Sequence, residues 1–180
     1  AWVDVVDSSD WLDGGNRSLW ISERDGWRHA YSISQDGHDL KLITPGEFDI
    51  ATVISVDTAG GWLYYAASPE NPTQRYLFRV RLDGSAAPQR LSPEGQYGTH
   101  NYNVAPGGRF AVHNFSNFAT PPATELVRLP SHEVIRTLAD NAELRHRYGL
   151  LRKGPSKFFR VDAGDGVCLD GVAMYPADFD

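Results

Sequence analysis

The sequence predicts an all-β fold made of consecutive four-stranded antiparallel β-propeller blades, a partial propeller, followed by one short helix and a terminal hairpin. Apolar strand-like runs are separated by Gly-Gly and Asp-Gly turns, which supply the positive φ angles of tight hairpins. Comparable strand ends recur at Ile43-Thr44, Leu91-Ser92 and Thr137-Leu138, roughly 48 residues apart, as in propeller blades. The run Trp62–Ala67 is apolar on both faces, which suits a strand that lies between two neighbouring sheets.

The first blade is expected to begin with an irregular, acidic lead-in over Ala1–Gly15, with Trp2 and Trp11 as its anchors. Three strands follow, separated by turns at Glu23–Gly26 and Gln35–His38. These strands are Leu19–Ser22, Ala30–Ser34 and Leu40–Thr44.

The next two blades are predicted from the same order of strands, turns and one longer loop. In Tyr76–Leu82 the apolar residues alternate with Leu77 and two arginines, which is a strand period. The second blade has strands Asp49–Val56, Trp62–Ala67, Tyr76–Leu82 and Gln89–Ser92. The third has Gly98–Ala105, Arg109–Phe115, Glu125–Leu129 and Val134–Leu138, with a long loop at Ser116–Thr124.

The repeat ends at residue 138, so we expect about three blades in residues 1–138 and a short helix with a linker in residues 139–156. Asp140-Asn141 offers an N-cap, and the helix Ala142–Tyr148 should end at Gly149. Residues Leu144, Tyr148 and Leu151 would line one of its faces. The two final strands, Lys157–Val161 and Val167–Tyr175, form a hairpin around Asp162–Gly166 that does not continue the repeat and begins another, truncated domain.

Composition excludes several classes of protein. The net charge of −6, with no block of Lys or Arg, argues against a nucleic-acid or anionic-membrane binder. No apolar run approaches the ~20 residues of a membrane-spanning helix. No signal peptide or initiator Met is present, so we expect an excised or processed segment. Asn16-Arg17-Ser18 and Asn114-Phe115-Ser116 match the glycosylation pattern, which matters only in a eukaryotic secreted protein.

The histidines are the first candidates for chemistry, and no two have the spacing that places two metal ligands on one helical face. His100 and His113 lie on strands expected to be neighbours, so a shared site is one interpretation; a structural or solvated role is favoured. His29 is expected to brace its hairpin with Trp27 and Tyr31, its imidazole bonded to the backbone. The six histidines are His29, His38, His100, His113, His132 and His146.

The other candidates also have a simpler structural interpretation. Cys168 is the only cysteine, which excludes an internal disulfide, and on a predicted buried strand it is expected to be an inert core thiol rather than a nucleophile. Asp162, Asp165 and Asp170 lack the Gly and Glu positions of a calcium loop and suit turns. Asn101-Tyr102-Asn103 and Asn114–Phe118 mix amides and aromatics, as carbohydrate or peptide grooves do, and as ordinary blade strands do. No metal site and no cofactor is predicted.

Several segments, in order, resemble the dipeptidyl peptidase IV family of serine peptidases, in the prolyl oligopeptidase clan. Trp20–Tyr31 is similar to the segment W-x-S-E-R-x-G-[WY]-x-H-x-Y in the later blades of that family's eight-bladed propeller. Ser116-Asn117 followed by Pro121-Pro122 resembles a blade loop. Residues 165–180 resemble the entry into the α/β-hydrolase domain, in Asp165-Gly166, Leu169-Asp170-Gly171 and Tyr175–Asp180. The resemblance implies that residues 157–180 are the first strands of a truncated α/β-hydrolase domain.

The resemblance implies a noncatalytic propeller fragment of an exopeptidase that releases N-terminal dipeptides, preferably after proline. The propeller would gate and position the peptide substrate. No serine here sits in a Gly-x-Ser-x-Gly elbow and no adjacent glutamates occur, so no catalytic or binding residue of the family is assigned to this chain. For the parent, the resemblance implies a homodimer and a periplasmic or secreted location.

An alternative interpretation is a propeller-like binding module for a protein or carbohydrate partner, with no catalytic domain. Phe158–Asp180 favours the peptidase, since a self-contained binder does not need that segment. In either case three blades do not close a ring, and two uncovered blade faces predict self-association.

Overall fold

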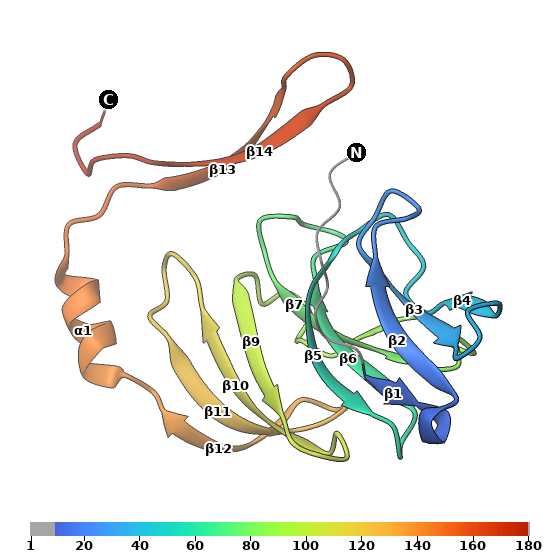
Figure 1. Cartoon of the computed structure of the whole chain (residues 1–180). Coiled ribbons are helices and arrows are strands. Elements are labelled where there is room, and N and C mark those ends of the chain that lie inside the picture. Colours follow the sequence, from blue (N-terminus) through green and yellow to red (C-terminus); the bar gives the residue numbers. More distant parts are fainter. Residues whose placement is uncertain (1–9, 180) are drawn as a thin grey trace.

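A computed structural model describes residues 10–179 of the chain, and the predicted anchor Trp2 lies outside them. Three four-stranded antiparallel sheets follow one another side by side, each with its strands in sequence order. A single helix and a two-stranded hairpin complete the described part (Figure 1). The predicted fold class is confirmed, and no sheet within residues 10–179 is closed on itself.

The first sheet contains a strand that the sequence did not reveal. Its strands are β1 (Trp11–Leu12), β2 (Arg17–Ser22), β3 (His29–Ser34) and β4 (Leu40–Leu42). A 3-10 turn, η1 (Asp13–Gly15), joins β1 to β2. The first strand has only two residues, which is too short to show the alternation of apolar and polar residues that predicts a strand.

The second and third sheets match the expected strands to within a few residues. The second comprises β5 (Ile50–Asp57), β6 (Trp62–Ala67), β7 (Tyr76–Arg81) and β8 (Gln89–Arg90). The third comprises β9 (Thr99–Val104), β10 (Phe110–Ser116), β11 (Ala123–Arg128) and β12 (Glu133–Ala139).

Strand β6 separates two hydrophobic cores. Leu63, Tyr65 and Ala67 belong to the core between the first and second sheets, whereas Tyr64 belongs to the core between the second and third. All four side chains are buried. The two-sided apolar run in the sequence therefore exists because neighbouring sheets pack on both faces of this strand.

The repeated strand ends have a common hydrogen bond in the first two sheets. The Thr44 hydroxyl accepts a bond from the Ala30 backbone N–H at 2.9 Å, and the Ser92 hydroxyl accepts one from Leu77 N–H at 2.8 Å. Each hydroxyl is fully or almost fully buried and follows a buried apolar residue, Ile43 or Leu91. The repeat thus marks the position where the segment at the end of the fourth strand is hydrogen-bonded to the third strand of the same sheet.

Helix α1 (Ala142–Leu150) differs from the expectation at its end and in its packing. It continues through Gly149 for one residue, and no residue of the helix is buried. Leu144 and Leu151 are half exposed, so the predicted apolar face is not covered within the described residues. Tyr148 is held by its hydroxyl, which donates to the Phe118 carbonyl.

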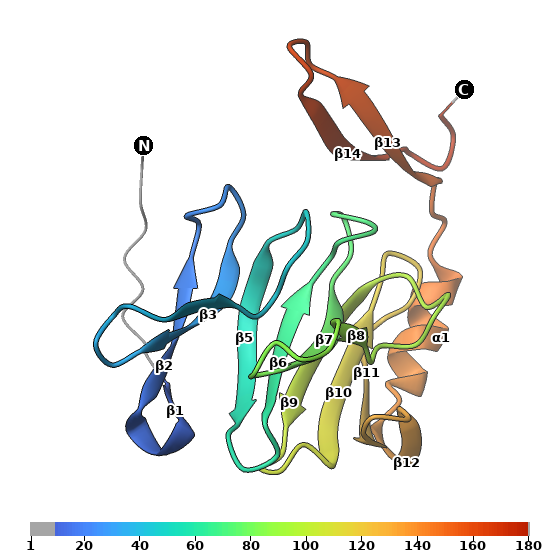
Figure 2. The ribbon, with the colours of Figure 1, turned by 90° about the vertical axis from the view of Figure 1, so that its right-hand side faces the viewer.

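The hairpin of β13 (Ser156–Asp162) and β14 (Cys168–Met174) lies over one end of the second and third sheets (Figure 2). No hydrophobic side chain of either strand is buried, and Cys168 is exposed. The expectation of a buried core thiol is therefore wrong. Two strands alone have no third layer to cover their apolar residues.

Candidate functional site

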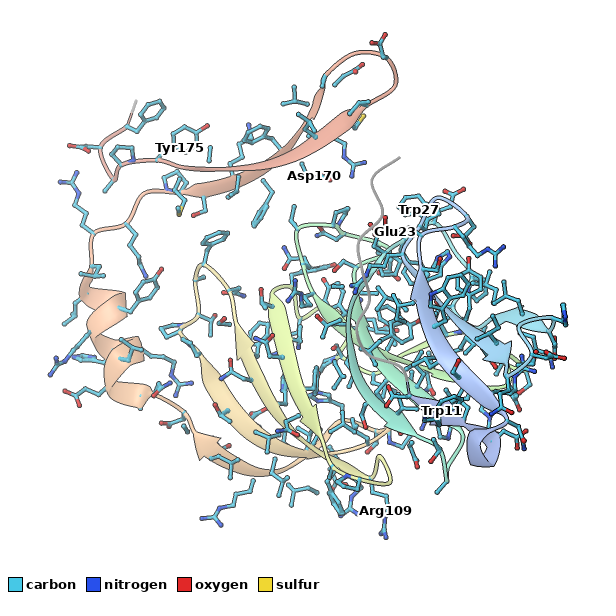
Figure 3. The ribbon with its side chains drawn as sticks, viewed as in Figure 1. Trp11, Glu23, Trp27, Arg109, Asp170 and Tyr175 are labelled. Atoms are coloured by element: carbon cyan, nitrogen blue, oxygen red, sulfur yellow. The ribbon has the colours of Figure 1, made fainter. Side chains whose placement is uncertain are left out.

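The hairpin and the turns of the blades meet at one end of the molecule, called the rim here. Figure 3 shows Glu23 and Trp27, in the turn between β2 and β3, at the same end as Asp170 of the hairpin. Arg109, in the turn between β9 and β10, lies at the opposite end. The rim turns of the sheets are residues 23–28, 68–75 and 117–122, together with the crossing at residues 93–98.

The first rim turn is fixed by one carboxylate. Asp25 accepts a hydrogen bond from His29 Nδ1 at 2.8 Å and from Trp27 N–H at 3.3 Å. Arg24 places its guanidinium over the rings of Trp20 and Tyr31, at 5.7 and 5.9 Å from their centroids. His29 is 2% exposed, so it braces the hairpin as expected, although its partner is the Asp25 side chain and not the backbone.

A cavity of about 560 Å³ opens between the second and third sheets and the hairpin. Its polar lining comes from Thr73 and Gln74 on one rim turn and from Asn117 on the next. Its aromatic lining is Tyr97, Phe118 and Phe158, the last from β13. The Phe118 and Phe158 rings lie 5.7 Å apart, and this pair joins the hairpin to the third sheet.

The floor of this rim cavity requires glycine at position 98. A Cβ on Gly98 would lie 2.6 Å from both the Phe115 ring and the Ser116 carbonyl oxygen. The Asn117 side chain donates to the Tyr97 carbonyl at 3.0 Å, which ties the two sides of the cavity together. The arrangement offers amide, hydroxyl and aromatic groups, a set that suits a peptide or a carbohydrate.

Of the two amide-and-aromatic segments predicted as groove candidates, only Asn114–Phe118 contributes residues to the cavity. From Asn114–Phe118, the residues Ser116, Asn117 and Phe118 line the cavity, whereas Asn114 bonds Thr124 in the sheet and Phe115 is buried. Asn101 and Asn103 are exposed on β9, and Tyr102 turns into the space between the second and third sheets.

Three of the six histidines come together away from the cavity. His100 and His113, on neighbouring strands as predicted, are each 1% exposed, and His100 Nδ1 lies 2.9 Å from His113 Nε2. His132, in the turn between β11 and β12, joins them, with its ring 4.7 Å from that of His113. Sequence reasoning missed His132 because only the β11–β12 turn brings it back. His38 and His146 are exposed.

The described residues contain no group of three or more His, Cys, Asp or Glu side chains placed to hold a metal ion. Asp162 accepts the Gly164 N–H at 2.8 Å, Asp165 has a φ of 52° and Asp170 pairs with Arg160, so all three serve the hairpin. Ser92 Oγ lies 3.1 Å from the Tyr102 hydroxyl, which lies 2.8 Å from His132 Nε2. Ser92 is 3% exposed, too buried to reach a substrate.

No helix within residues 10–179 has the length and apolar character needed to cross a bilayer.

These observations define a class of protein: successive propeller blades with a cavity at the rim and, in the described part, no assembled nucleophile, base and oxyanion set. Residues 1–122 match the family model described as "Dipeptidyl peptidase IV (DPP IV) N-terminal region". The chain therefore belongs to the dipeptidyl peptidase IV N-terminal region family.

The relatives that match are much longer than this chain. The Aspergillus oryzae protein described as "Probable dipeptidyl-aminopeptidase B" is 29% identical over 162 residues, covering 86% of this chain and 17% of that protein. "Dipeptidyl peptidase 4" of Trichophyton rubrum is 22% identical over 182 residues, covering 99% of this chain and 23% of that protein.

A solved structure supports the same arrangement of blades. Porphyromonas gingivalis dipeptidyl peptidase 4 superposes with a TM-score of 0.79 at 27% sequence identity, covering 94% of this chain and 24% of that one. The chain thus spans about a quarter or less of the proteins described here as similar to it.

Proposed function

We propose that this chain is the noncatalytic propeller part of a serine exopeptidase that releases N-terminal dipeptides, preferably after proline. In this proposal β13 and β14 are the first strands of an α/β-hydrolase domain. The blades gate access and position the peptide chain. Membership of the dipeptidyl peptidase IV N-terminal region family supports the proposal, because its members named here are dipeptidyl peptidases.

The single observation that carries the proposal is the hairpin over the rim. Phe158 faces the blades, so the alternate residues Phe159 and Val161 point to the other side of the hairpin. Leu169 pairs with Val161 on that side, and the three side chains are 42–56% exposed. A two-stranded hairpin with an uncovered apolar face is marginal in water and needs further strands or a helix.

The rim cavity supports the assignment of substrate contact to this end of the blades. Asn117 and Gln74 can bond the amides of an extended peptide, while Tyr97 and Phe118 offer flat apolar surface. Phe158 closes the cavity from the hairpin side, so a peptide bound there would lie between the blades and the proposed catalytic domain.

The test uses the full-length protein of which these residues are part, with a Gly-Pro chromogenic substrate and longer peptides that begin Gly-Pro. Gln74→Ala should raise KM for the longer peptides about threefold to tenfold, the effect of one lost hydrogen bond, and leave kcat nearly unchanged. His38→Gln, at an exposed turn of the first blade, is the matched control. Absence of dipeptide release by the full-length protein would contradict the proposal.

The amide-and-aromatic lining also favours a second candidate, a binding module for a carbohydrate or protein partner. The same assay separates the two candidates. Binding of an oligosaccharide that Gln74→Ala abolishes, in a full-length protein without peptidase turnover, would support the module.

A further inference from the structure

The buried histidines form a cluster that the rim does not use. It comprises His100 on β9, His113 on β10 and His132 in the turn that follows β11, with Tyr102 stacked on His113 at 4.5 Å. The His100 and His113 rings stack at 5.1 Å. On the second sheet Tyr76 lies 5.6 Å from His100, so the cluster sits at the junction between the second and third sheets.

Hydrogen bonds fix which nitrogen carries the proton in the His100 and His113 rings. His100 Nε2 lies 2.9 Å from the Gln96 carbonyl oxygen, which can only accept, so His100 donates from Nε2. In a neutral ring Nδ1 is then the acceptor, and it lies 2.9 Å from His113 Nε2. His113 therefore donates from Nε2, and its own Nδ1 carries no proton.

His113 Nδ1 is the last atom in this series of hydrogen bonds. It is buried and has no hydrogen-bond partner among the described residues. Glu125 Oε2 lies 3.6 Å from it, so at neutral pH two acceptors face each other. A proton that enters here makes an imidazolium beside a carboxylate, whereas both nitrogens of His100 are already in use.

Charges around the cluster limit the number of protons that it can hold. Glu125 faces His113 and His132 from β11 and favours charge on them, whereas Arg90 faces His100 from β8 and opposes it. Tyr76 and Tyr102 are neutral. A second proton would place two cations within about 5 Å in a buried site, which Coulomb repulsion strongly opposes.

We propose that the histidine cluster makes the junction between the second and third blades acid-sensitive, with Glu125 the group that stabilises a proton on His113. Further protonation separates the two blades at this junction. The inter-blade backbone bonds there join Arg75 N–H to the Gly98 carbonyl and His100 N–H to the Arg75 carbonyl, at 3.1 and 3.0 Å.

The sign of the pH dependence follows from burial. Burial, together with charge on His132 and His100, lowers the pKa of His113 to about 3, and burial lowers the pKa of His100 and of His132. The unfolded chain therefore binds more protons than the folded chain. The free energy of unfolding contributed by these rings is fully present above pH ~6.5 and is lost progressively down to the folded value.

The experiment measures urea unfolding of the protein at pH 7.5 and pH 5.0. Over this interval one ring with the His113 pKa raises the unfolding equilibrium constant about 30-fold. His113→Gln should remove about that factor from the wild-type pH dependence, and the exposed-site control His38→Gln should leave it unchanged. An unaltered pH dependence in a folded His113→Gln protein would overturn the proposal.

A second measurement uses the wild-type protein and does not depend on the folding of a variant. Ring 15N–1H correlation spectra should show His100 and His113 protonated on Nε2 at pH 7.5, with the His113 ring unchanged at pH 5.0. At lower pH Glu125→Gln should lower the midpoint of the His113 titration. A proton on His113 Nδ1 at pH 7.5, or an unchanged His113 midpoint in Glu125→Gln, would overturn the proposal.

Discussion

The Tyr64 hydroxyl of β6 lies 3.5 Å from the Gly108 carbonyl oxygen, in the turn between β9 and β10. Tyr64 is 2% exposed, and Gly108 is buried beneath its ring. This contact joins the second and third sheets at the end opposite the rim, where Arg109 lies (Figure 3). The fit depends on the absence of a side chain at position 108.

Gly108→Ala should therefore destabilise the fold. The added Cβ would overlap the Tyr64 hydroxyl and lie 2.6 Å from Cζ, at a residue whose φ is +63°. We expect a loss of about 2–4 kcal/mol in the free energy of unfolding, measured in urea. Gly107→Ala is the control, because Gly107 has a φ of +77° but nothing within 4 Å of the added Cβ. It should lose only about 1 kcal/mol, and equal losses would refute the packing argument.

The attachment of the hairpin to the blades rests on the Phe118–Phe158 pair. The single cysteine, Cys168, is exposed on the hairpin and offers a labelling site for fluorescence anisotropy. Phe118→Ala should lower the anisotropy of the label, because it removes an aromatic contact of about 0.5–1.5 kcal/mol. Phe159→Ala, on the other face of the hairpin, should not lower it. A label that is equally restrained in Phe118→Ala would show that the hairpin is held by other contacts.

Uncovered blade faces should cause self-association. Ala111 and His113 of β10 are buried toward the second sheet, so Val112 between them lies on the open face of the third sheet and is 40% exposed. Sedimentation should show a concentration-dependent mass for residues 1–180, and Val112→Glu should shift it toward the monomer. Ala87→Glu adds the same charge at an exposed turn and should change nothing. A monomer at all concentrations would contradict the expectation.

The blade strands could be predicted from the sequence because turn residues and apolar runs, which lie close together in the chain, define them. Trp62–Ala67 was predicted to the residue, since Gly-Gly precedes it and both its faces are apolar. β1 escaped prediction because Trp11-Leu12 is a strand only through its pairing with Arg17 and Ser18. Gly149 does not end the helix, because the N–H of the next residue, Leu150, remains in the helical ladder.

The candidate sites were less predictable, because they depend on where turns bring distant residues. Neighbouring strands suggested a contact between His100 and His113, yet nothing in the sequence pointed to His132. Asp25 and His29 are only four residues apart, but the shape of the turn decides that the His29 imidazole bonds the Asp25 carboxylate and not the backbone. Cys168 was expected to be buried because its strand is apolar, and burial needs a layer that residues 10–179 do not contain.

The most direct test of the central claim is dipeptide release from Gly-Pro-p-nitroanilide, measured for residues 1–180 alone and for the full-length protein at equal concentration. We predict no turnover by residues 1–180 and clear turnover by the full-length protein, lost on treatment with a serine-directed covalent inhibitor. Turnover by pure residues 1–180, or none by the folded full-length protein, would contradict the assignment of these blades to a serine dipeptidyl peptidase.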